Sequence, residues 1–108
     1  MIIFDNNTKR AGVLKRLIKK QGHGVTISIY KDETKCTEAL ASTDIVDMLW
    51  IGIDAEYLIQ WITSMEPSVR RIIIYHDLDI QAVLATLRKA KYTAEHIPYN
   101  LLHERLSS

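Results

Sequence analysis

The stretch DIVDMLWIGIDAEYLIQW, residues 44–61, decides the fold. Its first half, residues 45–53, is apolar except for Asp47 and Gly52. Apolar and polar residues do not alternate there, which indicates a strand covered on both faces, as in a parallel sheet. After Asp54 the spacing becomes helical, with apolar residues on one face at positions 55, 58, 59, 62 and 65. The stretch therefore predicts a buried strand followed at once by a helix that packs against the sheet.

Short β-prone runs and helical patterns alternate along the rest of the chain. Five strands are predicted, at residues 2–4, 25–30, 45–53, 71–75 and 93–97, and a helix follows each of them. This alternation predicts one α/β domain, residues 1–108, with right-handed crossover connections. The expected architecture is a flavodoxin-like three-layer sandwich: a five-stranded parallel sheet of order 2-1-3-4-5 with helices on both faces.

Composition places the chain among ordinary globular proteins. It has 47% apolar and 25% charged residues. Cys36 is the single cysteine, so an intrachain disulfide is excluded. No apolar run approaches the roughly 18 residues of a membrane span, and Asp5 interrupts the first apolar run too early for a signal peptide. We therefore expect a cytoplasmic protein without a membrane partner.

Charge is distributed unevenly along the chain. Residues 1–31 hold seven Lys/Arg and one acidic residue, whereas residues 32–108 hold seven Lys/Arg and twelve acidic residues. The first helix could contact nucleic-acid phosphates or an acidic protein partner, although it lacks the interleaved aromatic residues that stack on bases. A solvated outer face is the commoner explanation for such a pattern. The six cations concerned are Lys9, Arg10, Lys15, Arg16, Lys19 and Lys20.

Polar side chains follow three of the predicted strands. Asp5, Asp54 and the pair His76-Asp77 come where strands 1, 3 and 4 end, so they should lie along the carboxyl edge of the sheet. Asp5, Asp54 and Asp77 are candidate Mg²⁺ ligands. If the protein is an enzyme, Asp5, Asp54 and His76 would act in a phosphoesterase-like reaction on a cyclic or terminal phosphate. The alternative is that Asp54 and Asp77 cap helices and that Asp5 is a turn residue.

Other reactive residue types give weaker signals. No Cys or His pair has the spacing of zinc ligands. Lys35 could lower the pKa of Cys36, but no base accompanies that thiol, which argues against a nucleophile. Trp50 and Trp61 are predicted core residues.

The order of elements resembles the receiver domains of response regulators. EAL at 38–40 followed by TDIV at 43–46 carries the resemblance, together with DAEYLI at 54–59, which is similar to the start of the family's third helix. The second half of the chain looks more like a receiver-related group proposed to process cyclic phosphates. There the segments concerned are IIIYH, ATLRKAKY and HIPY, within residues 71–99. The resemblance covers nearly the whole chain.

The chain also departs from the receiver pattern at each functional position. An active receiver has an acidic pair after strand 1, but here two asparagines follow Asp5. An active receiver has an aspartate phosphoacceptor after strand 3. At that position this chain has Leu49 if positions are counted forward from Asp44, and Asp47 if they are counted back from Asp54. An active receiver also has a lysine after strand 5, where IPY stands at 97–99. The His-Asp pair of the cyclic-phosphate group is replaced by GID at 52–54.

Because the chain resembles receivers but departs from their pattern at the functional positions, the resemblance implies a degenerate receiver module. Such a module would bind a macromolecular partner, most simply a protein, without a phosphorylation switch. No cofactor is expected other than Mg²⁺ at the carboxyl edge. In receivers the face formed by the last elements is often a dimer or partner surface, which would involve Tyr99, Leu101 and Leu102 here. These three residues could instead pack on the sheet.

Overall fold

The structure, a computed structural model, describes residues 1–22, 24–53, 55–77 and 79–106. It confirms the predicted five-stranded sheet, in which all neighbouring strands are parallel and the order is β2-β1-β3-β4-β5. The strands are β1 (Ile2–Phe4), β2 (Ser28–Tyr30), β3 (Val46–Ile51), β4 (Val69–Ile74) and β5 (Ala94–His96).

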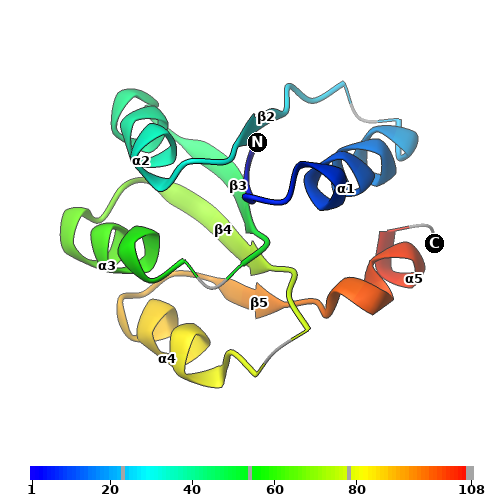
Figure 1. Cartoon of the computed structure of the whole chain (residues 1–108). Coiled ribbons are helices and arrows are strands. Elements are labelled where there is room, and N and C mark those ends of the chain that lie inside the picture. Colours follow the sequence, from blue (N-terminus) through cyan, green and yellow to red (C-terminus); the bar gives the residue numbers. More distant parts are fainter. Residues whose placement is uncertain (23, 54, 78, 107–108) are drawn as a thin grey trace.

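The helices form two layers around this sheet. Figure 1 shows α1 and α5 on one face, whereas α2, α3 and α4 lie on the other. The flavodoxin-like three-layer arrangement is therefore present as predicted. The helices are α1 (Thr8–Lys20), α2 (Glu33–Ser42), α3 (Glu56–Met65), α4 (Gln81–Lys89) and α5 (Leu102–Leu106), and a 3₁₀ turn, η1 (Tyr99–Leu101), precedes α5. Among the residues described, no helix combines the length and apolar character that a membrane span needs.

The central strand supplies both halves of the core. Leu49 and Ile51 are buried under the layer of α2, α3 and α4, while Trp50 is buried on the opposite face with α1. On β4, Ile72 and Ile73 divide between the two faces in the same way. This explains why the sequence of β3 shows no alternation, because each of its faces meets an apolar layer.

Strand β2 is shorter than the predicted strand at residues 25–30. It covers only residues 28–30, and Val25 and Thr26 are exposed before it. Helix α1 is capped by Asn7, whose side-chain oxygen accepts from the Arg10 amide at 3.1 Å, and Thr8 is the first helical residue. Asn100 lies inside the 3₁₀ turn that precedes α5.

Candidate functional site

The carboxyl edge of the sheet contains a fully buried carboxylate, Asp5. The Nε of Arg10 donates to Oδ2 and its Nη2 donates to Oδ1, each at 2.7 Å. The Tyr75 hydroxyl donates to Oδ2 at 2.8 Å, and the Asn7 amide donates to Oδ1 at 2.9 Å. Four donors thus match the approximately four lone-pair sites of an ionised carboxylate. The arrangement is a bidentate ion pair completed by one phenol and one backbone amide.

Backbone register brings these residues together. Asp5, Gly52 and Tyr75 each directly follow a strand, and the Gly52 amide donates to the carbonyl of Phe4 at 2.9 Å. Gly52 therefore lies between Asp5 and Tyr75, which follow β1 and β4, two strands that are not neighbours in the sheet. A Cβ at position 52 would lie 2.2 Å from Oδ2 of Asp5 and 2.6 Å from Cζ of Tyr75. Glycine is thus required for Asp5 and Tyr75 to meet.

The surroundings of Asp5 keep both of its side-chain donors, Tyr75 and Arg10, protonated. Burial, with the negative charge of Asp5, raises the pKa of the Tyr75 phenol well above its ordinary value, so the phenol stays a hydrogen-bond donor. The hydrogen bond to Asp5 raises the pKa of the Arg10 guanidinium, so this cation keeps its charge. Arg10 also lies over the Tyr99 ring, 6.0 Å from the ring centroid. The cation that Asp5 holds in this structure is therefore a side chain of the same protein.

Of the other residues predicted at this edge, the two that the structure describes, His76 and Asp77, do not join Asp5. Asp54 lies outside the described residues. The exposed Asp77 accepts a hydrogen bond from the Asn100 amide at 3.3 Å, and the carbonyl of His76 accepts from Nε2 of half-buried His96. Within the described ranges, no group of three or more His, Cys, Asp or Glu is placed to hold a metal ion.

Helix α1 presents an uncompensated positive face. Lys9, Arg16, Lys19 and Lys20 are exposed and Lys15 is half-buried. Arg10 is the one α1 cation with a carboxylate partner, and no acidic side chain of the described part lies within 4.0 Å of the other five. The helix itself contains no Asp or Glu. The six α1 cations predicted to bind a partner therefore divide into one that pairs with Asp5 and five that have no carboxylate partner in the described part of the chain.

The partner surface predicted near the C-terminus, formed by Tyr99, Leu101 and Leu102, is only partly accessible to solvent. Leu102 is 1% exposed and packs in the core with α1, because α5 lies against that helix. Tyr99 and Leu101 are half-buried.

Cys36 is fully buried, and this burial raises the pKa of its thiol to about 12. The shift is opposite to the lowered pKa that the neighbouring Lys35 suggested in the sequence. Its thiol therefore stays protonated and does not suit nucleophilic chemistry.

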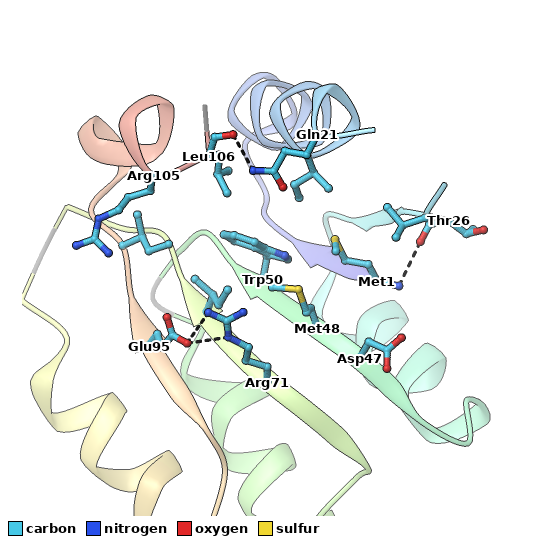
Figure 2. A pocket seen from close by; sticks show the side chains of 14 residues that line it. Met1, Gln21, Thr26, Asp47, Met48, Trp50, Arg71, Glu95, Arg105 and Leu106 are labelled. Carbon is cyan, nitrogen blue, oxygen red and sulfur yellow. Dashed lines mark hydrogen bonds and ion pairs between the residues drawn. The ribbon is translucent and has the colours of Figure 1, made fainter. Parts of the chain in front are cut away.

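A groove on the sheet face, beside the C-terminal ends of α1 and α5, was not predicted from the sequence. Its volume is about 630 Å³, and Figure 2 shows Trp50 in the middle of its lining, with Met1 and Met48 beside it. An ion pair closes part of the floor, since Nη2 of Arg71 lies 2.6 Å from Oε1 of Glu95. One signal was present in the sequence: Arg71 and Glu95 are charged residues at inward positions of predicted strands. Their significance depended on how far the last helix extends over the sheet, which spacing does not show.

Comparisons of this chain with models of known protein families, with curated proteins and with solved structures found no significant match. What is established is thus the flavodoxin-like fold, the buried cluster at its carboxyl edge, the basic face of α1 and the open groove.

Proposed function

We propose that this protein is a degenerate receiver-like module that binds an acidic protein partner through α1 and is not switched by phosphorylation. The observation that carries the proposal is the saturated carboxylate of Asp5. In the receiver pattern this position helps to hold a divalent cation. Here the guanidinium of Arg10 takes up the charge of Asp5 from within the chain.

Replacing that guanidinium by a metal ion would be unfavourable. Mg²⁺ requires nearly octahedral oxygen ligands and keeps several waters, whereas Asp5 is fully buried. Displacing Arg10 would also leave a partly buried cation without its carboxylate, and breaking a buried ion pair costs about 3 to 5 kcal/mol. Asn6 and Asn7 stand in place of acidic neighbours of Asp5, and Asn7 already caps α1. We therefore expect no mass adduct after incubation with acetyl phosphate and Mg²⁺, and a phosphoaspartate adduct would contradict this part of the proposal.

Helix α1 offers a charged surface for binding a partner. A helix of 13 residues is about 20 Å long, enough to present its five free cations to one partner surface. Their charges are not neutralised within the described part of the chain, so an acidic surface would both attract and orient the module. We favour a protein over a nucleic acid because α1 offers no aromatic side chain on which bases could stack.

Affinity capture from extracts of the source cell tests this proposal when the bait is varied in charge. The test bait is Lys15→Glu with Arg16→Glu, and the matched control is Lys35→Glu with Lys89→Glu on the opposite layer. We expect nuclease-treated extracts to yield proteins that the wild type and the control bait retain and that the α1 variant loses. Capture that disappears with nuclease treatment would favour the nucleic-acid alternative, and equal retention by all three baits would contradict a role for α1.

A further inference from the structure

Trp50 carries a buried hydrogen-bond donor that no group in the described part of the chain satisfies. The residue is 2% exposed, and within the described part of the chain its indole Nε1 has no acceptor. An indole N–H can only donate, and buried donors in native proteins nearly always have a partner. Trp50 also lines the groove on the sheet face beside the C-terminal ends of α1 and α5. We propose that this groove binds a small, mainly apolar molecule whose neutral carbonyl oxygen accepts the Trp50 N–H.

The shape of the groove suits a small molecule. Its volume of about 630 Å³ lies within the range of ligand pockets, roughly 300 to 1,000 Å³. Ile73 and Ile97 form the floor with Trp50, while Ile18 of α1 and Leu106 of α5 contribute from the two helices. The two helices are tied together above it, since Nε2 of Gln21 donates to the carbonyl of Leu106 at 2.7 Å (Figure 2).

The side chains next to Trp50 can yield to a ligand. Met1 and Met48 lie beside the indole in Figure 2 and are only partly buried. Methionine side chains are flexible and adapt to the shape of a bound group. A ligand that displaces them would gain apolar contact and reach the indole nitrogen at the same time.

The charges around the groove indicate a neutral ligand atom at Trp50. Arg71 and Glu95 pair with one another at 2.6 Å, and Asp47 lies 3.6 Å from Arg70 at the far rim. Arg105 is exposed at the edge, so no unpaired charge of the lining is buried beside the indole. A carboxylate buried there would lose its hydration for a single hydrogen bond, which is unfavourable. A ketone, lactone or amide oxygen carries no net charge, so its burial there would not have this cost.

A covering helix or a second copy of the chain fits the groove less well. The backbone carbonyls of an α-helix already accept hydrogen bonds within that helix. An apolar face of another copy would bury the indole N–H further without offering it an acceptor. A small carbonyl compound is the occupant that satisfies both the apolar lining and the donor.

The indole signals of Trp50 and Trp61 in a proton–nitrogen correlation spectrum provide the test. Trp61 packs on the opposite face of the sheet, so it is an internal control. The probes are 2-acetonaphthone and 2-ethylnaphthalene, which differ mainly in the carbonyl group. We expect the ketone to move the Trp50 signal downfield and leave Trp61 in place. The hydrocarbon should bind about fivefold more weakly, the ratio that corresponds to one net hydrogen bond.

Two variants separate the hydrogen bond from simple apolar binding. Trp50→Phe keeps an aromatic ring but removes the donor, so the ketone should lose its advantage over the hydrocarbon. The matched variant Trp61→Phe should keep it. Equal affinities of the two probes for the wild type, or no effect of either on Trp50, would overturn the proposal. If dilution of the protein alone moves the Trp50 signal, a second copy covers the groove and the proposal is equally overturned.

Discussion

The hydroxyl group of Tyr75 donates to Asp5 at 2.8 Å across Gly52, and so connects two strands, β1 and β4, that are not neighbours in the sheet. Arg10 binds the same carboxylate from α1. The carboxyl edge is thereby fixed by contacts between residues far apart in the sequence. Removing one partner from this buried pair should therefore destabilise the fold.

Arg10→Met should destabilise the protein by about 3 to 5 kcal/mol, because it leaves the carboxylate of Asp5 buried without its cation. Arg10→Lys should cost less, since it keeps the charge but loses the bidentate geometry. The exposed Arg16→Met is the control and should change the free energy of unfolding by no more than about 0.5 kcal/mol. Urea denaturation measures all three, and equal values for Arg10→Met and Arg16→Met would refute the structural role.

Gly52→Ala should be destabilising because its methyl group would lie 2.2 Å from Oδ2 of Asp5. Forcing an added methyl group into a packed site costs about 1 to 3 kcal/mol. Gly12→Ala is the matched control, since nothing lies within 4 Å of a Cβ built there on α1. That substitution should stabilise the protein by about 0.5 to 1 kcal/mol, so the two changes should shift the thermal midpoint in opposite directions. A fold that tolerates both equally would contradict the close approach at Gly52.

Stability should decline at alkaline pH. Burial raises the pKa of the Cys36 thiol to about 12, whereas in the unfolded chain it titrates near about 8.5. Between these two pKa values the unfolded state binds fewer protons than the folded state. The contribution of Cys36 to the free energy of unfolding is therefore fully present below the pKa of the unfolded chain, and it is lost as the pH rises towards the pKa of the folded chain. The slope is about 1.4 kcal/mol per pH unit within the window.

The Tyr75 phenol, whose pKa is raised in the same direction, should add a further decline above about pH 10, its ordinary pKa. Cys36→Ala should remove the part of the slope that begins at lower pH and leave the part due to Tyr75. Denaturation midpoints measured across the alkaline range for wild type and variant provide the check. Parallel curves would show that the Cys36 thiol does not titrate as its burial requires.

Glu33→Ala should destabilise the start of α3. The side chain of Glu33, on α2, accepts a hydrogen bond from the Leu58 amide at 2.8 Å, and the residue at the α3 N-cap, Ala55, makes no side-chain capping bond. Loss of a helix cap costs typically about 1 kcal/mol. Glu38→Ala, at an exposed position of α2, should cost much less. Hydrogen exchange of the first α3 amides, compared between the two variants, would reveal whether the effect is local as expected.

The sequence was most informative where burial imposes a pattern. The continuous apolar runs around Leu49 and Ile73 predicted the two central strands, and the alternating elements predicted the parallel order. The contact between Asp5 and Tyr75 could not be predicted in this way, since it joins residues 70 positions apart and depends on the missing side chain of Gly52. Local patterns carry no information about such a meeting.

The groove was missed for a related reason. Trp50 was correctly predicted as a core residue, but its unsatisfied N–H depends on which groups lie around the indole. Val25 and Thr26 looked like strand residues because they continue the alternation of Ser28–Tyr30, yet β1 has only three residues with which to pair. The extent of a strand depends on its neighbour, and the extent of a groove depends on the helices above it.

The central claim is that the carboxylate of Asp5 is held by Arg10 and Tyr75 and not by an exchangeable cation. A titration of the nitrogen-labelled protein with Mg²⁺ and beryllofluoride tests it most directly, with the amides of Gly52, Ile53 and Tyr75 as reporters. We expect these signals to stay in place up to saturating concentrations of both. Saturable shifts at these amides, absent from Asp5→Asn, would show that the edge accepts a cation and a phosphoryl analogue, and would contradict the account.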